Sequence, residues 1–200
     1  MNIIELKTEV LNICRKLPQC GLVTGTAGNV SARDPETGLV AIKPSGVPYE
    51  EMELDDIVVL TLSGDIVEKK GNRKSSFETP THLEIYRRYP NVNGVIHTHS
   101  KFVNTLSSVM DEIPCATTPT GIRLLLKPID VIDFINNGTQ EMADKVAPSL
   151  ESSVAVAIRN HGPFTVGETV QLALERAVAL EDTSQLYFQA SLLGTPSLIE

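Results

Sequence analysis

Three of the four histidines in this chain of 200 residues lie in two short motifs. His97 and His99 flank one threonine, and His161 lies between an asparagine and a glycine. Side chains two positions apart on a strand point to the same face, so His97 and His99 can act together. Neutral imidazoles carry no charge and are good ligands for divalent metals. The spacing therefore predicts a metal site formed by His97, His99 and His161.

The composition of this site is typical of catalytic rather than structural zinc. Three nitrogen ligands hold the ion, and a fourth position stays open for a substrate. A structural zinc site would more often use cysteines, but Cys14, Cys20 and Cys115 are odd in number and lack a Cys-x-x-Cys spacing. We expect one Zn²⁺ per subunit, with another divalent metal as the alternative.

A carboxylate, Glu78, precedes a predicted helix, and two interpretations of it stay open. Ser75 and Glu78 have the spacing of a capping box, and Thr79-Pro80 is a second possible helix start. In the first interpretation Glu78 only caps the helix. In the second it moves a proton beside the metal. His82, on the same helix, is expected to pack or cap rather than to bind metal.

A metal next to a carboxylate suits the chemistry of keto sugars. A Lewis acid can chelate a carbonyl and the adjacent hydroxyl and stabilise an enediolate. Three turns with small or hydroxyl-bearing residues could hold a phosphate, because backbone amides approach a ligand closely there. They contain Asn29, Ser45-Gly46 and Ser75-Ser76. Together these features predict a small phosphorylated sugar as the substrate.

Hydrophobic periodicity predicts the elements that position these residues. Strands are expected at 29–33, 39–42, 57–62, 65–68, 95–99, 113–116, 154–159 and 163–166. Helices are expected at 3–17, closed by Pro18, and at 79–88, 101–109, 139–148 and 169–193. Segment 117–128 is expected to be a loop. The sequence thus predicts one α/β domain over 1–200 with helices on both sides of a mixed, largely antiparallel sheet.

The last predicted helix carries an unusual carboxylate on its inward face. That face is expected to contain Val170, Leu174, Ala177, Val178, Glu181, Ser184 and Leu186. Glu181 could orient a ligand histidine from behind, or it could lie at the edge of the face. The sequence does not decide between the two.

Bulk composition excludes several classes of protein. The net charge of −8 argues against a nucleic-acid partner, which requires a basic face. No segment has the roughly twenty apolar residues that a membrane span needs. The N-terminus, with Glu5 and Glu9, does not resemble a secretory signal. We therefore expect a cytoplasmic protein with no membrane and no nucleic-acid partner.

Five motifs, taken in order, resemble the family of class II aldolases, ribulose-phosphate 4-epimerases and adducin heads. They are Thr26–Ser31 (TAGNVS), Lys43–Gly46 (KPSG), Ser76–His82 (SFETPTH), His97–Ser100 (HTHS) and Asn160–Pro163 (NHGP). The resemblance covers nearly the whole chain and is closest in type to L-fuculose-phosphate aldolase. It implies a three-layer αβα domain and a homotetramer.

The resemblance also implies roles for particular residues. His97, His99 and His161 correspond to zinc ligands, and Glu78 to the catalytic acid/base of the fuculose-phosphate aldolases. Asn29, Ser45, Gly46 and Ser76 correspond to phosphate-binding positions. Phe77 stands where many members have a second serine, which leaves Ser75 as the alternative contact. The aldolases use one tyrosine in the loop after the HTH strand and another in a C-terminal tail, and neither has a counterpart here.

The reaction that follows from this resemblance is cleavage of a phosphorylated ketose to dihydroxyacetone phosphate and an aldehyde. Such an enzyme is a metal-dependent aldehyde-lyase of carbohydrate metabolism. The first alternative is an L-ribulose-5-phosphate 4-epimerase, in which an aspartate usually replaces the glutamate. The second is a non-catalytic interaction module like the adducin head, which predicts a damaged set of metal ligands.

Overall fold

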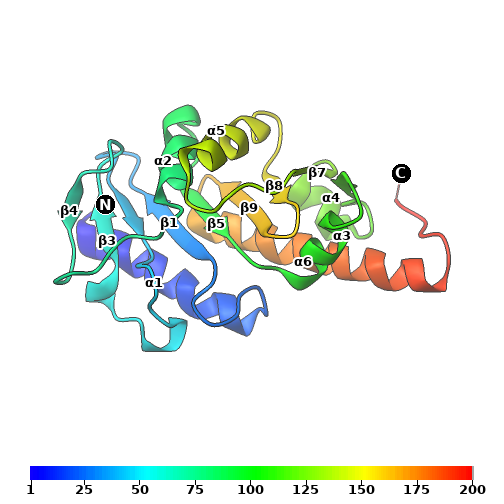
Figure 1. Ribbon diagram of the computed structural model, residues 1–200, viewed down its shortest axis with the longest axis horizontal. Helices are drawn as coiled ribbons and strands as arrows, with labels where there is room; N and C mark the ends of the chain where they lie inside the picture. Colours follow the sequence, from blue (N-terminus) through cyan, green and yellow to red (C-terminus); the bar gives the residue numbers. More distant parts are fainter. Residues whose placement is uncertain (200) are drawn as a thin grey trace.

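The structure is a computed structural model that describes residues 1–199, and its strands form one sheet of nine. The order across the sheet is β4-β3-β2-β1-β5-β9-β8-β7-β6 (Figure 1). Only β7 and β8 pair in parallel, so the predicted mixed, largely antiparallel sheet is confirmed. The strands are β1 (Asn29–Arg33), β2 (Val40–Ile42), β3 (Val58–Leu60), β4 (Ile66–Glu68), β5 (Gly94–His97), β6 (Glu112–Ile113), β7 (Ile129–Ile132), β8 (Ala155–Ile158) and β9 (Gly162–Gly167).

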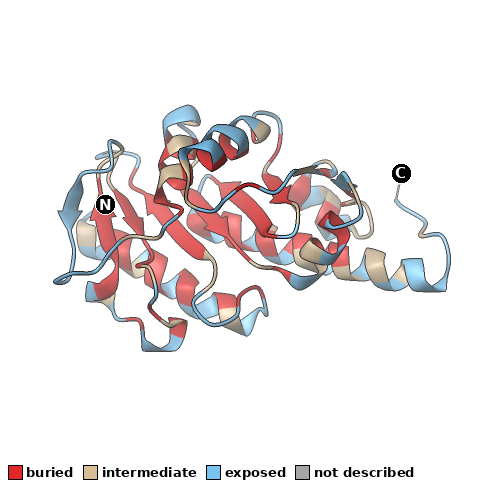
Figure 2. Cartoon of the chain, viewed as in Figure 1, coloured by how far each residue is buried: buried red, intermediate tan, exposed pale blue. Residues whose placement is uncertain are grey.

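Helices cover both faces of this sheet, which confirms the three-layer prediction. One face packs against α1, α3, α4 and α6, and the other against α2 and α5 (Figure 1). The central strands are buried on both faces (Figure 2). The helices are α1 (Ile3–Gln19), α2 (Thr79–Arg88), α3 (Lys101–Ser107), α4 (Pro119–Leu125), α5 (Gln140–Ser149) and α6 (Val170–Leu193). None of the helices within residues 1–199 is long and apolar enough to cross a membrane.

Successive side chains along each strand point alternately into the cores on the two faces of the sheet. Ile96 of β5 belongs to the core under α1, and its neighbour Val95 to the core under α2 and α5. In β8, Ala155 and Ala157 face α3, α4 and α6, whereas Val156 faces α5. This is the period of two that a strand with both faces covered requires.

Three local predictions were wrong, and one strand was missed. Pro18 does not close the first helix, which continues to Gln19. Segment 117–128 is not a loop, because α4 begins after Thr118, whose side chain accepts a hydrogen bond from Gly121 N. The strand expected to reach His99 ends at His97, and β7 was not predicted.

The inward face predicted for α6 is correct only in part. Val170, Leu174, Ala177 and Ser184 are buried, whereas Val178 and Leu186 are 39% and 41% exposed. The end of α6 runs beyond the sheet, as the orange-to-red helix in Figure 1 shows. A stretch without a sheet beneath it has nothing to bury its apolar side chains.

Three neighbouring strands position the predicted site residues. Asn29, the first residue of β1, lies opposite His97, the last residue of β5. On the other side of β5, His97 lies opposite Phe164 of β9. The loop between β8 and β9 carries His161 to the same end of the sheet. Antiparallel pairing thus brings residues that are far apart in the sequence together at one end of these strands.

Candidate metal centre and adjoining cavity

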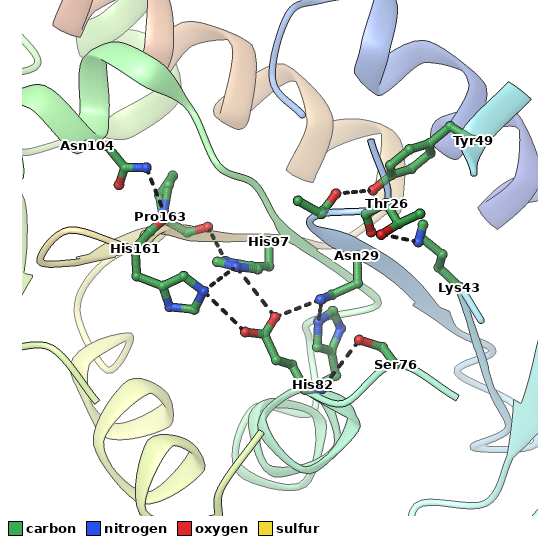
Figure 3. A network of polar contacts seen from close by, with 12 residues as sticks. Thr26, Asn29, Lys43, Tyr49, Ser76, His82, His97, Asn104, His161 and Pro163 are labelled. Carbon is green, nitrogen blue, oxygen red and sulfur yellow. Dashed lines mark hydrogen bonds and ion pairs between the residues drawn. The ribbon is translucent and has the colours of Figure 1, made fainter. Parts of the chain in front are cut away.

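The three predicted metal ligands converge. The ring nitrogens that His97, His99 and His161 can offer all lie within 4.8 Å of one another. Nε2 of His97 lies 3.2 Å from Nε2 of His161 (Figure 3). His97 and His161 are buried, and His99 is half-buried. The sequence therefore identified a cluster that the fold assembles from the end of β5 and from the loop between β8 and β9.

A hydrogen bond behind His97 fixes which nitrogen faces the cluster. His97 Nδ1 lies 3.0 Å from the carbonyl oxygen of Pro163 (Figure 3), which can only accept. Nδ1 therefore carries the proton, and Nε2 presents a lone pair to the other two rings. The ring also stacks on Phe164 with centroids 4.4 Å apart. Its position and its tautomer are both set before any ion binds.

This donor set fits a divalent cation. Burial, followed by the neighbouring His99, lowers the pKa of His97 to about 3, so its ring is neutral near pH 7. Burial and His97 likewise lower the pKa of His161 to about 4. Two nitrogens on a tetrahedral Zn²⁺ with Zn–N bonds of about 2.0–2.1 Å lie about 3.3 Å apart, close to the 3.2 Å seen here. Three neutral imidazoles suit zinc or a similar borderline metal.

The turn that carries His161 depends on a glycine. Gly162 has φ +155°, and a Cβ there would lie 2.0 Å from the carbonyl oxygen of Thr98. The chain after His97 thus packs directly on the chain after His161. On the other side, Asn104 Nδ2 donates to the His161 carbonyl at 2.9 Å (Figure 3). Glycine is therefore required next to His161 for a steric reason.

We expect Gly162→Ala to destabilise the protein by about 3 kcal/mol or more and to weaken metal binding, because the two ligand loops must separate. Urea denaturation and a metal titration would measure both effects. Gly194→Ala is the matched control, since no atom lies within 4 Å of a Cβ at that position. Equal stability of the two variants would contradict this account.

The carboxylate of Glu78 faces the histidine cluster and does not cap the helix. Glu78 occupies the position before α2, but its side chain makes no capping hydrogen bond. Oε2 lies 3.5 Å from His97 Nε2, and Oε1 lies 3.5 Å from His161 Nε2. Oε2 also accepts a 2.6 Å hydrogen bond from Asn29 Nδ2. Of the two interpretations open from the sequence, the structure excludes helix capping.

Burial controls the proton affinity of this carboxyl. Glu78 is only 5% exposed. Desolvation raises its pKa, and the hydrogen bond from Asn29 and the nearby His161 and His99 oppose that rise. A carboxyl whose pKa is moved toward neutrality can both take up and release a proton.

A cavity of about 470 Å³ opens beside Glu78 and His99. Its walls come from segments 26–29, 43–46 and 76–78, together with Asn137. Four of the five predicted phosphate-site residues, Asn29, Ser45, Gly46 and Ser76, therefore line one space. Ser75 does not line it and instead forms a β-bridge with Pro44. Phe77 lies at the cavity as well, with a side chain that is 76% exposed.

A buried cation at this cavity was not predicted as a site residue. Lys43 is 2% exposed, and its Nζ donates to the carbonyl oxygen of Thr26 at 3.2 Å (Figure 3). It also donates to the carbonyl oxygen of Pro44 at 3.3 Å. Nζ also lies 4.7 Å from the centre of the Tyr49 ring. Burial lowers the pKa of this ammonium. Within residues 1–199 no carboxylate lies within ion-pair distance of Nζ, so an anion in the cavity would find an uncompensated charge.

Glu181 has a role that neither interpretation from the sequence anticipated. Its carboxylate accepts hydrogen bonds of 3.1 Å from the backbone N–H groups of Phe102 and Val103. These are free donors at the start of α3, directly after the His97–Ser100 motif. Glu181 thus anchors the loop that carries His99 without touching a ring.

We expect the metal-free protein to lose stability as the pH falls below 6.5. Burial lowers the pKa of His82 and of His97 to about 3, whereas unfolded histidines titrate near 6.5. The stability that these neutral rings contribute is complete above pH 6.5 and is lost as the pH falls toward 3. Each ring should cost roughly 2 kcal/mol at pH 5. Glu78, whose pKa is raised, opposes this trend.

Urea titrations of chelator-treated protein between pH 7.5 and 5 would measure this loss. The control variant His82→Gln lacks one of the two rings, so the number of protons taken up on unfolding should fall by about one. The slope of the free energy of unfolding against pH should decrease accordingly. A free energy of unfolding that stays constant over this range would contradict the prediction.

Comparison with known proteins gives one consistent result. The family model described as "Class II Aldolase and Adducin N-terminal domain" matches residues 8–188. A Bacillus thuringiensis serovar kurstaki protein named 5-deoxy-D-ribulose 1-phosphate aldolase is 33% identical over 196 residues, covering 96% of this chain and 89% of that protein. A solved L-fuculose 1-phosphate aldolase superposes with a TM-score of 0.91 at 30% identity, covering 98% and 91% of the two chains. The L-fuculose-1-phosphate aldolase of Thermus thermophilus gives a TM-score of 0.81 at 28% identity, covering 96% and 98%.

Proposed function

The chain belongs to the family of class II aldolase and adducin N-terminal domains, and on this premise we propose that it is a zinc-dependent aldolase. It would cleave a phosphorylated ketose to dihydroxyacetone phosphate and an aldehyde. One observation carries the proposal: a buried carboxylate lies 3.5 Å from two of three converging histidines, at one end of a cavity with a cation at its wall.

His97, His99 and His161 would hold the cation. The chemistry that it supplies when bound is Lewis-acid stabilisation of the negative charge that develops on adjacent oxygens of a ketose. The protein prepares this by keeping all three rings neutral and by orienting His97 through Pro163.

Glu78 would transfer the proton. Cleavage breaks the C3–C4 bond, turns the C4 hydroxyl into the aldehyde carbonyl and leaves an electron pair on the three-carbon fragment. The hydroxyl proton must leave, and C3 must gain a proton to give dihydroxyacetone phosphate. A carboxyl held by Asn29 next to the ligands, with a pKa raised by burial, is suited to this exchange.

The phosphate would occupy the end of the cavity away from the histidines. Two backbone hydrogen bonds tie the loops there, from Ser45 N to the Lys74 carbonyl and from Ser76 N to the Lys43 carbonyl. The walls are therefore fixed before an anion arrives. The Lys43 ammonium and the Ser45 and Ser76 side chains supply a charge and hydroxyl donors.

Among phosphorylated ketoses, we propose a ketose 1-phosphate with a short or deoxygenated tail. The curated relative is named for 5-deoxy-D-ribulose 1-phosphate, and the solved relatives for L-fuculose 1-phosphate. The exposed aromatic ring of Phe77 at the cavity gives an apolar surface for such a tail. None of these three relatives is named as an epimerase, so we do not carry that alternative further.

We also propose a cytoplasmic homotetramer, in line with the family resemblance. The end of α6 supports self-association, since Leu192 and Leu193 are 71% and 93% exposed. The binding-module alternative predicts damaged ligands, yet all three histidines are present and converge.

The test is elemental analysis of the purified protein combined with a product assay. We expect near-stoichiometric zinc, and release of dihydroxyacetone phosphate from 5-deoxyribulose 1-phosphate or fuculose 1-phosphate. A chelator should abolish release, and added zinc should restore it. Full zinc occupancy without release from any ketose 1-phosphate would overturn the aldolase proposal.

A further inference from the structure

A chain of polar side chains runs through the core from Tyr86 to Glu78. Tyr86 Oη lies 2.7 Å from Ser31 Oγ, and Ser31 Oγ lies 2.6 Å from His82 Nδ1. His82 Nε2 contacts Asn29 Oδ1, and Asn29 Nδ2 lies 2.6 Å from Glu78 Oε2 (Figure 3). All five residues are at most 5% exposed. Such a continuous buried network is stable only if every member is satisfied.

Only one arrangement of hydrogens satisfies every contact when Glu78 is ionised. The carboxylate can only accept, so Asn29 turns its amide nitrogen to Glu78 and its oxygen to His82. His82 must then donate from Nε2, which leaves Nδ1 as an acceptor for the Ser31 hydroxyl. Ser31 in turn accepts from Tyr86. Each hydrogen bond points toward Glu78.

We propose that His82 is a positioning residue for Glu78: its Nε2–H holds the Asn29 carboxamide in the one orientation that donates to the catalytic carboxylate. In this role His82 acts on Glu78 only through Asn29, and not by a contact with the cavity or with the three histidines. The inference rests on the role proposed above for Glu78. On packing alone, His82 would be assigned only to the core, because its ring meets that of Phe164 edge to face. The proposed role makes it part of the site.

The chemical state of His82 agrees with this role. Burial, followed by the nearby His97, lowers the pKa of His82 to about 3, so the ring stays neutral near pH 7. A neutral ring has one donor and one acceptor, and the acceptor-only carboxylate of Glu78, acting through Asn29, makes Nε2 the donor. If Nδ1 carried the proton instead, Asn29 would rotate and present its oxygen to Glu78. Two acceptors would then face each other across 2.6 Å.

The first test compares two amide replacements. In His82→Gln, the amide nitrogen of the new side chain can reach the position of Nε2 and donate to Asn29. In His82→Asn, the new side chain is too short to do so. We expect His82→Gln to keep kcat within about 5-fold of the parent and His82→Asn to lose about 10²-fold, the scale of a misplaced catalytic group. Metal content should be unchanged in both. The proposal would be overturned if the two variants lost kcat equally. It would also be overturned if the loss of kcat in each variant simply followed its loss of melting temperature.

A milder variant covers the case in which His82→Asn does not fold. Ser31→Ala removes only the hydroxyl that donates to Nδ1 of His82 and helps to hold the ring, and we expect about a 10-fold loss of kcat. Thr81→Val is the matched control: Thr81 is the neighbour of His82, is buried, and its hydroxyl has no partner within the described residues. Its kcat should not change. Full activity in Ser31→Ala would overturn the proposal.

Nitrogen NMR of ring-labelled histidine tests the relay without any turnover. The chain has four histidines, so the signals that His82→Gln removes can be assigned directly. We expect protonated Nε2 and bare Nδ1 for His82. A bare Nε2 would overturn the relay. The expected tautomer in a protein that cleaves no ketose phosphate would instead refute the proposed function and leave the relay standing.

Discussion

Replacement of Glu78 by glutamine is expected to lower kcat by about 10³-fold with no loss of metal. Glutamine has nearly the same shape, and its amide oxygen can still accept from Asn29 Nδ2, so the buried packing is preserved. What is lost is the ability to take up and release a proton. General acid–base groups contribute about 10²–10⁴-fold, which sets the expected size. Steady-state kinetics and elemental analysis of the same preparation would measure both quantities.

Glu84→Gln is the matched control for this variant. Glu84 lies on the same helix, but it pairs with Arg87 at the surface, where such a pair contributes at most about 1 kcal/mol. Its kcat should equal that of the parent. Turnover retained in Glu78→Gln would remove the carboxylate from the proposed reaction, although the structure has already excluded helix capping as its role.

The second large effect is expected for His97→Ala, which should lose the metal and all measurable cleavage while remaining folded. His97 is fully buried and stacks on Phe164, so the truncation also leaves a cavity that costs about 2–5 kcal/mol. That loss lies below the 5–15 kcal/mol typical of a domain, so the monomer should persist. Circular dichroism, urea denaturation and elemental analysis at pH 8 would separate these effects.

His99→Ala separates metal loss from core damage. His99 is only half-buried, so its removal should abolish metal binding with a smaller loss of stability than His97→Ala. If either purified variant retained a full equivalent of metal, the three-histidine site would be wrong.

The sequence predicted most of the fold because its strong signals are local. The β-branched stretch 154–159 and the alternation around β1 and β2 gave strands within one or two residues. Helix α4 was missed although Thr118-Pro119 is a good start signal, because the threonines and prolines around it also suit a loop. The apolar residues at the exposed end of α6 resemble those in its buried part, and only the extent of the sheet distinguishes the two.

The site was less completely predictable because its decisive contacts are tertiary. The histidine cluster could be found because histidine is rare in this chain and chemically specific. Glu78 had two interpretations of similar local merit, and the choice depends on Asn29, 49 residues earlier. Lys43 lies in a polar turn, where a cation usually points to water. The residues next to it in the sequence do not indicate that its side chain is buried. The relay through His82 likewise joins residues from β1 and α2.

The anchoring of α3 by Glu181 has a consequence for how the protein is made. Synthesis proceeds from the N-terminus, so the three histidines proposed as metal ligands leave the ribosome before Glu181 does. Until then the N–H groups of Phe102 and Val103 lack the acceptor that holds the loop after His99. Strand β9, which backs His97, also emerges only after His161. A nascent chain that already contains every ligand is therefore not yet a competent metal site, and the long C-terminal helix makes its completion a late step of biosynthesis.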